Sequence, residues 1–277
     1  MTKYGKIVAL LAIGALVLSV LAVAGCTQPA TPTKPAETTT TPTVELKLVT
    51  PGELTVGSDT AFPPFESMNG QVAEGFDVDL MGAIAKEMGI SKVVFKTEIF
   101  DTLIPTLKAG GKFDVIASGM TIKAERQKEI DFSDPYFDSN QSVAMKTGGT
   151  YTAPADLKGK KVGVQSGTTG ESWAKENLKP AGAEIVPFKD AVSAFSALQA
   201  GNVYAVINDL PVTAEVVKDT TKGLAMVAQI PTGEQYGFGV SKENPDLLKA
   251  INDALKKVKD SGEYASIYKK WFGVEPE

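Results

Sequence analysis

The stretch DVIASGMTIKAER, residues 114–126, contains the single arginine of the chain within a strand–turn–helix pattern. The β-branched run at 114–118 predicts a strand, Gly119 a turn, and Thr121 the N-cap of the helix that carries Arg126. All other basic residues are lysines, and only a guanidinium grips a carboxylate with two parallel hydrogen bonds. The pattern therefore predicts an anion site at Arg126. The alternatives are chance, or a cation near the helix C-terminus, which a lysine would supply equally well.

A second strand–loop–helix unit follows in the other half of the chain. The run KVGVQ, residues 161–165, predicts a strand, and the loop SGTTG, 166–170, leads into a helix from Glu171. Such a helix N-terminus presents backbone N–H groups to an anion, although a plain tight turn explains the loop equally well. The segment has neither GK[ST] nor GxGxxG, so it is not a nucleotide-binding loop. Two such units in different halves favour a small carboxylate held between two lobes.

Short apolar runs alternate with amphipathic stretches after residue 43, which predicts an α/β fold with parallel strands. The expected strands are 54–58, 93–97, 115–118, 161–165, 205–208 and 236–240. The expected helices are 77–88, 102–109, 191–200 and 246–259. The 234 residues from 44 to 277 exceed the usual size of one domain, so two lobes are expected.

The N-terminus is expected to direct the chain to a membrane surface. Residues 1–25 have the lysines and the apolar run of a signal peptide, and a retained anchor helix is the alternative. The sequence VAGC, 23–26, resembles a bacterial lipobox, in which Cys26 would become the lipidated first residue after cleavage. Residues 26–43 then form an extended tether, because TQPATPTKPAETTTTPT lacks the large apolar side chains of a core.

Composition excludes several classes of function. Removal of Lys3 and Lys6 with the signal peptide leaves 26 basic against 33 acidic residues, which argues against nucleic acid as a partner. The chain has no histidine, and Cys26 is its sole cysteine. A zinc site, a Ser-His-Asp triad, a Cys-His pair and an intrachain disulfide are therefore excluded. We expect neither a metal nor a cofactor.

Several sequence blocks resemble bacterial extracellular solute-binding proteins of family 3, the polar amino-acid receptors of ABC importers. These blocks include VGSDTAFPPFE, GFDVDLMGAIAKEMG, FDVIASGMTIKAERQKEIDFSDPYF, LKGKKVGVQSGTTGE, AVINDLPV and EQYGFGVSKEN. The resemblance implies a type II periplasmic binding protein, with two α/β lobes joined by a two-strand hinge. Lobe 1 would be 44–143 and 236–277, and lobe 2 would be 144–235. The hinge strands would lie near 143–147 and 235–240.

The resemblance also implies how an α-amino acid is held. Arg126 would clamp the α-carboxylate, and Asp209 would accept from the α-ammonium, so that neither ligand charge is buried unpaired. The residues implied to add contacts to these two groups are Ser118, Gly119, Thr121 and Thr169. Asp209 follows a predicted strand, where ligands of α/β folds bind. Its alternative role is a solvated helix N-cap before Pro211.

The ligand side chain would be recognised elsewhere. The resemblance implies a pocket formed by Asp59, Phe62, Phe100 and Gln165, with Glu66 nearby. Two aromatic faces beside an acid favour a guanidinium, an ammonium or an amide. L-Arginine is the first expectation and L-glutamine the second, followed by lysine or histidine. Core packing is the alternative role for the two phenylalanines.

The expected function is a lipid-anchored receptor on the outer face of the cytoplasmic membrane. It would act as a monomer that delivers an L-amino acid to the permease and ATPase of an ABC transporter, without performing chemistry. One alternative is an enzyme similar to cyclohexadienyl dehydratase, with Asp59 or Glu66 as general acid. If the substrate of such an enzyme carries carboxylates and no ammonium group, it offers no partner for Asp209. A second alternative is a ligand-sensing module.

Overall fold

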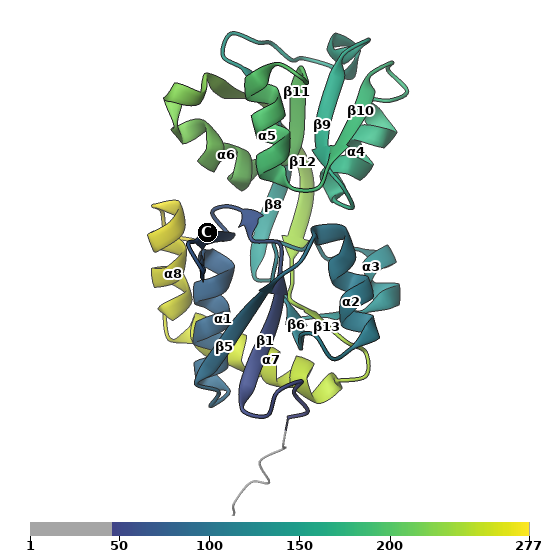
Figure 1. Ribbon diagram of the computed structural model, residues 1–277. Helices are drawn as coiled ribbons and strands as arrows, with labels where there is room; N and C mark the ends of the chain where they lie inside the picture. Colours follow the sequence, from purple (N-terminus) through teal and green to yellow (C-terminus); the bar gives the residue numbers. More distant parts are fainter. Residues whose placement is uncertain (1–45, 277) are drawn as a thin grey trace, which may run out of the picture. The chain divides into compact units, whose positions relative to one another are not determined.

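The computed structural model describes residues 46–276 (Figure 1). The expected signal peptide, Cys26 and the tether lie outside the described residues. Within the described part, no helix is long and apolar enough to cross a membrane. Two five-stranded sheets dominate this part, and helices cover both (Figure 1). The expected α/β fold of a periplasmic binding protein is confirmed.

The first sheet has the strand order β5-β1-β6-β13-β7. Its strands are β1 (Glu53–Ser58), β5 (Lys92–Thr97), β6 (Val115–Ile116), β7 (Asp131–Phe132) and β13 (Gly239–Val240). β1 runs parallel to β5 and β6, whereas β13 is antiparallel to β6 and β7. The apolar residues of β1 and β6 are fully buried because helices cover both faces of the sheet.

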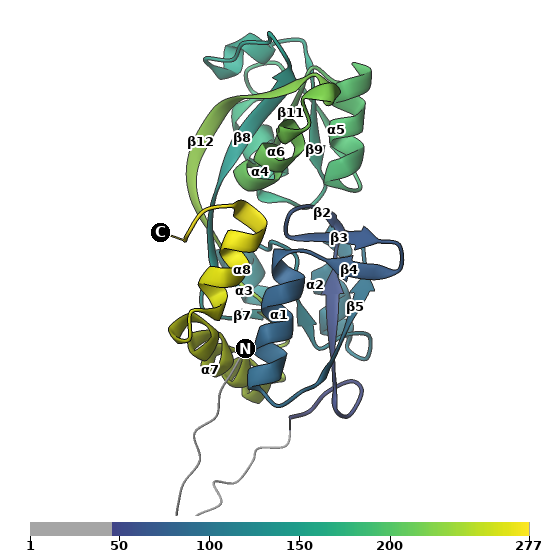
Figure 2. The ribbon, with the colours of Figure 1, turned by 90° about the vertical axis from the view of Figure 1, so that its left-hand side faces the viewer.

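Six helical segments accompany this sheet and its connections (Figure 2). They are α1 (Phe76–Glu87), η1 (Phe100–Thr102), α2 (Leu103–Ala109), α3 (Ala124–Glu129), α7 (Pro245–Asp260) and α8 (Glu263–Phe272). In α7 the apolar side chains of Leu247, Ile251, Leu255 and Val258 are buried. A small sheet of β2 (Ala61–Phe62), β3 (Glu66–Asn69) and β4 (Val72–Glu74) lies between β1 and α1 in the chain.

The second sheet has the order β10-β9-β11-β8-β12. Its strands are β8 (Phe137–Lys146), β9 (Lys161–Gln165), β10 (Glu184–Phe188), β11 (Ala205–Asp209) and β12 (Leu224–Tyr236). β9 is parallel to β10 and β11, and β8 is antiparallel to β11 and β12. The helical segments here are η2 (Pro154–Leu157), α4 (Thr169–Asn177), α5 (Ala191–Ala200), α6 (Leu210–Lys218) and η3 (Thr220–Lys222).

The long strands β8 and β12 run from the first sheet into the second (Figure 1). They pair from Phe137 with Tyr236 to Lys146 with Leu224. Aromatic rings pack around the end nearest the first sheet, with Phe137 5.6 Å from Tyr236 and 4.9 Å from Phe65 between ring centroids. We call β8 and β12 the crossing strands, because they run from one lobe to the other. Packed aromatic rings hold them at the end nearest the first sheet.

Two local expectations were wrong. The expected strand at 236–240 is interrupted, because the Gly237 N–H donates to Met120 O at 3.1 Å instead of to a neighbouring strand. The helix that carries Arg126 begins at Ala124, and its N-cap is Lys123 without a side-chain capping bond. Thr121 is not the N-cap, since its hydroxyl donates to Glu234. The sheets are also mixed, whereas parallel strands were expected.

Candidate functional site

The predicted site residues gather where strands of the two sheets end and face one another. Asp59 follows β1, Ser118 follows β6, Gln165 ends β9 and Asp209 ends β11. All four side chains are buried, with exposed fractions of 5% or less. This is the edge at which α/β sheets bind ligands, because loops and helix N-termini converge there.

Arg126 is buried in this region, beside the aromatic ring of Phe100. Its Cζ is 5.2 Å from the ring centroid, a cation–π distance. Nη1 donates to Thr121 O at 2.8 Å, and Nη2 donates to Gly167 O at 3.0 Å. Burial lowers the pKa of Arg126 to about 10, while Asp209 and Glu234 oppose the shift. The guanidinium therefore stays charged at neutral pH and connects the two lobes through its planar fork.

A second contact between the lobes joins Asp59 and Gln165. Nε2 of Gln165 donates to Oδ2 of Asp59 at 2.5 Å, whereas Oε1 of Gln165 has no hydrogen-bond partner. Burial raises the pKa of Asp59 to about 6, although the bond from Gln165 lowers it. Phe62 is also buried, and a Cβ at Gly119 would come within 2.9 Å of its ring. Of the residues implied to recognise a ligand side chain, Asp59 and Gln165 are thus in direct contact.

Gly167 marks a third close approach between the lobes. A Cβ on Gly167 would lie 2.7 Å from Cβ of Asp101, shorter than side chains tolerate. Its φ of +75° is also in the left-handed region that favours glycine. The loop of the second lobe can therefore reach η1 only because position 167 has no side chain.

Ser118 and Gly119 direct their polar groups into the first lobe. Oγ of Ser118 accepts from the Asp59 N–H at 2.9 Å and donates to Oε1 of Glu66 at 2.8 Å. The Gly119 N–H donates to Oδ2 of Asp77 at 2.9 Å. These bonds fix the turn before Arg126. The Ser118 hydroxyl and the Gly119 N–H already have partners in the first lobe. The turn can therefore offer a ligand its backbone carbonyls.

Glu66 and Asp77 are fully buried acids beneath this turn. Tyr136 Oη donates to Asp77 at 2.7 Å, but Oδ1 of Asp77 and Oε2 of Glu66 have no hydrogen-bond partner. Burial raises the pKa of Glu66 well above its usual range, with Asp77 adding repulsion, and burial raises the pKa of Asp77 to about 7. Asp77 lies in the GFDVDL block but was not among the site residues predicted from the sequence.

Asp209 is a buried acceptor and not a solvated cap. It occupies the N-cap position of α6 without a capping bond, and its carboxylate accepts instead from Gln141 Nε2 at 2.6 Å and from Tyr236 Oη. Burial and the charge of Glu234 raise the pKa of Asp209 to about 7, while both hydrogen bonds and Arg126 lower it. This carboxylate has therefore lost its water and gained no cation in direct contact.

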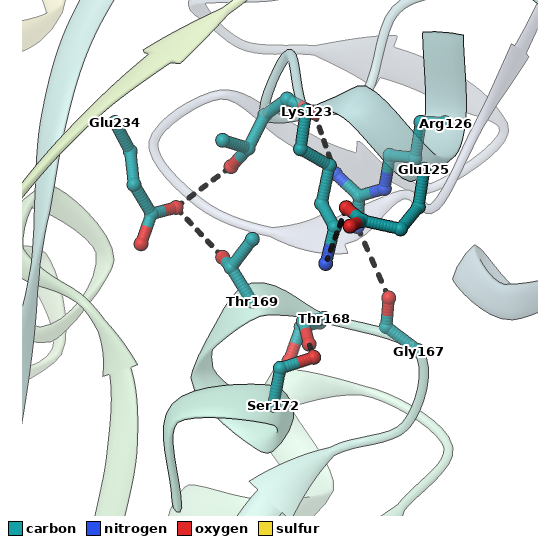
Figure 3. A network of polar contacts seen from close by, with 9 residues as sticks. Lys123, Glu125, Arg126, Gly167, Thr168, Thr169, Ser172 and Glu234 are labelled. Carbon is teal, nitrogen blue, oxygen red and sulfur yellow. Dashed lines mark hydrogen bonds and ion pairs between the residues drawn. The ribbon is translucent and has the colours of Figure 1, made fainter. Parts of the chain in front are cut away.

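Thr121 and Thr169 meet at a residue that the sequence analysis missed. Their hydroxyls both donate to Oε2 of Glu234, each at 2.7 Å (Figure 3). Gln141 Nε2 donates to Oε1 of the same carboxylate at 3.0 Å and also lies 3.2 Å from Thr169 Oγ1. The structure thus brings a residue of each lobe and a residue of each crossing strand into one network. Only the block EQYGFGV, quoted for the resemblance, contained a signal for Glu234.

No metal centre is formed by the described residues, since residues 46–276 contain no cluster of three or more metal-ligating His, Cys, Asp or Glu side chains. The site instead consists of one guanidinium, several buried carboxylates, two aromatic rings and two hydroxyls. This composition can hold a ligand that carries both charges, because each ligand charge finds an opposite charge.

Comparison with known sequences identifies the family. The sequence model for "Bacterial extracellular solute-binding proteins, family 3" matches residues 54–274. The chain belongs to this family. This solute-binding protein is 40% identical over 225 residues to a probable histidine-binding protein of Neisseria gonorrhoeae, covering 79% of the chain and 83% of the relative. It is 39% identical to a putative ABC transporter arginine-binding protein of Escherichia coli, covering 78% and 88%.

Solved structures support the same family. An ancestral arginine-binding protein matches with a TM-score of 0.76 in its complexes with arginine, at 45% identity, and with glutamine, at 44% identity. Each match covers 80% of this solute-binding protein and 99% of the ancestral chain. An ancestral amino-acid-binding protein described as a precursor of cyclohexadienyl dehydratase matches with a TM-score of 0.73 at 40% identity, covering 80% and 96%.

The raised pKa values predict how ligand-free stability depends on pH. Asp59, Glu66, Asp77 and Asp209 have pKa values above those of the unfolded chain, so between about pH 4 and pH 7 the folded state binds more protons. The free energy of unfolding should therefore fall as pH rises from 5 to 8, by at least about 1.4 kcal/mol, the free energy of one pKa unit. Urea unfolding at several pH values measures this slope.

A variant pair identifies the source of the slope. Asp77→Asn should make the pH dependence shallower, because it removes one buried titrating group. Asp253→Asn, which changes an exposed acid paired with Lys249, should leave the slope unchanged. A wild-type stability that increases from pH 5 to pH 8 would contradict the assignment.

Proposed function

We propose that the chain is the receptor of an ABC importer for a polar L-amino acid, with L-arginine as the first ligand and L-glutamine as the second. The observation that carries the proposal is the burial of opposite charges in one region, with Arg126 on α3 of the first lobe and Asp209 at the end of β11 in the second lobe. An α-amino acid carries one negative and one positive group close together. Burying it there gives each group a counter-charge, which avoids a cost of several kcal/mol per unpaired charge.

The ligand α-carboxylate is assigned to Arg126, Thr121 and Thr169. The guanidinium has five N–H donors, and two bonds to backbone carbonyls leave others for a carboxylate. Thr169 opens α4, where backbone N–H groups add a favourable dipole for an anion. The backbone carbonyls of the turn at Ser118 and Gly119 are assigned to the α-ammonium together with Asp209.

The ligand side chain is assigned to the pocket of Asp59, Phe62, Phe100 and Gln165. A guanidinium or an amide can take the place of Gln165 Nε2 as the donor to Asp59. The two rings offer apolar faces for the ligand stem. L-Arginine leads because it also supplies a positive charge to a buried acid. The ancestral relative has been solved with arginine and with glutamine, which supports these two ligands as candidates.

The proposed setting follows from the family and the N-terminus. Lipidation at Cys26 would anchor the receptor to the outer face of the cytoplasmic membrane, with residues 26–43 as tether. The monomeric receptor would deliver its ligand to the permease and ATPase subunits of the importer. A role as ligand-sensing module would use the same site with a different membrane partner.

A dehydratase activity is the second candidate. Its support is the buried Glu66 carboxyl, whose raised pKa lets it hold a proton, together with the similarity to the ancestral precursor. Asp209 opposes it, because a substrate without an ammonium group leaves this buried carboxylate unpaired. We expect no turnover of prephenate, which has no ammonium group, in an absorbance assay, and measurable turnover would establish the enzyme.

The ligand assignment is tested by a thermal-shift screen of the twenty L-amino acids. Ligand at about 100 times its dissociation constant should stabilise the folded protein by about 2.7 kcal/mol. Arg126→Lys should remove most of this shift, because lysine keeps the charge and loses the bidentate fork. Lys128→Arg, on the same helix, is the matched control and should bind normally. If the unfolding temperature of the ligand-free Arg126→Lys variant falls by as much as the ligand raises that of the wild type, Arg126 has a structural role instead.

Ligand binding should also release protons. The ligand ammonium lowers the raised pKa of Asp209, and a ligand guanidinium does the same for Asp59, so both carboxyls lose protons on binding near pH 6. The dissociation constant for L-arginine should therefore fall as pH rises from 5 to 8. Calorimetry at pH 6 in two buffers of different ionisation enthalpy measures the protons released. Proton uptake on binding would exclude this arrangement.

A further inference from the structure

Glu234 lies where β12 departs from regular pairing with β8. The register shifts between Ile230 and Glu234, and Gly233 has a φ of +63°. Oδ1 of Asn140, on β8, accepts from the N–H groups of Thr232 and Gly233 at 2.9 and 3.0 Å. The bulge is therefore fixed by its own hydrogen bonds. Bulges redirect the side chains that follow them, and this one turns Glu234 toward the loop at Thr169 (Figure 3).

Glu234 receives four hydrogen bonds in this position. Thr121 and Thr169 donate to Oε2, while Gln141 Nε2 and Thr232 Oγ1 donate to Oε1, both at 3.0 Å. The donors come from the first lobe, the second lobe and both crossing strands. A carboxylate with four donors is well satisfied, so this arrangement favours the approach of the two lobes in the absence of ligand.

The two threonine hydroxyls are also the donors assigned above to the ligand carboxylate. A hydroxyl has a single proton and donates one hydrogen bond. While Thr121 and Thr169 donate to Glu234, they cannot donate to a ligand. Gln141 also holds the carboxylates of Glu234 and Asp209 on one amide nitrogen, which places two negative charges near the same ligand subsite.

We propose that Glu234 is an internal occupant of the carboxylate subsite, which closes the ligand-free lobes and competes with the ligand for Thr121 and Thr169. The inference rests on the proposed amino-acid site. An incoming ligand carboxylate pairs with Arg126 and displaces Glu234. Glu234 is only half-buried, and it borders a groove with Thr232, Gln235 and Trp173 into which its carboxylate can withdraw. Ligand affinity thus depends on how much more favourably the subsite binds the ligand carboxylate than the carboxylate of Glu234.

Substitution of Glu234 by glutamine tests the competition. Glu234→Gln keeps the shape of the side chain but weakens a charged acceptor to a neutral one, so L-arginine and L-glutamine should bind tighter, on the order of tenfold. Glu176→Gln is the matched control, because Glu176 borders the same groove, is exposed, and removes the same charge. Calorimetry on the full-length chain measures both. Unchanged or weaker binding by Glu234→Gln overturns the proposal.

A second readout needs no ligand. Spin labels at Met68, on β3, and Val192, on α5, report the separation of the lobes on the side away from the crossing strands (Figure 2). Both positions are exposed, and Cys26→Ser removes the native thiol. Without ligand, Glu234→Gln should shift the distance distribution to longer values, and Glu176→Gln should not. An unchanged distribution overturns the proposal.

The two readouts also separate this inference from the proposed function. If the wild-type chain binds no amino acid, the proposed function is wrong, and so is the competition between Glu234 and the ligand. The label distances still show whether Glu234 holds the ligand-free lobes together. A wild-type chain that binds L-arginine while Glu234→Gln neither opens nor tightens retains the proposed function and loses the inference.

Discussion

The burial of charge between two lobes is the constraint on which the rest of the structure depends. One guanidinium, that of Arg126, lies in a region with the carboxylates of Asp59, Asp209 and Glu234. A buried charge without a partner costs more than a salt bridge returns, so each of these four charged groups is held by specific donors or acceptors. The turn at Ser118, the amide of Gln141 and the hydroxyls of two threonines satisfy these groups. The fold therefore supplies polar groups to the cleft from both sheets and from both crossing strands.

The crossing strands have a chemical role in addition to their mechanical one. β8 contributes Gln141 and β12 contributes Glu234, while Tyr236 at the end of β12 donates to Asp209. A movement of one lobe relative to the other must change the twist of these strands, and with it the positions of these three side chains. Hinge motion and charge placement are thus properties of the same residues. This arrangement is one way in which occupancy of a site is converted into a change of conformation.

Much of the fold was predictable because it depends on local patterns. Helix 191–200 and strand 161–165 were predicted to the residue, since their apolar runs end at glycine or polar residues. The importance of Arg126 was visible because every other basic residue is a lysine. Glu234 could not be found in this way, because its donor Thr121 lies 113 residues earlier in the chain. The same long-range bond explains why Thr121 did not cap its helix. Asp77 was missed for a similar reason, since its partners Gly119 and Tyr136 belong to later segments.

Gly167 determines how far the lobes can close. Because a Cβ there would meet Asp101, any other residue at 167 acts as a wedge that keeps the two rims apart. The wedge would act between the loop of the second lobe and η1, next to the Gly167 carbonyl that accepts from Arg126. A chain with such a wedge could retain every ligand contact contributed by one lobe and still be unable to present a closed surface to a partner. A glycine at position 167 is thus required for closure of the two lobes around a solute, and not for the contacts that one lobe makes with that solute.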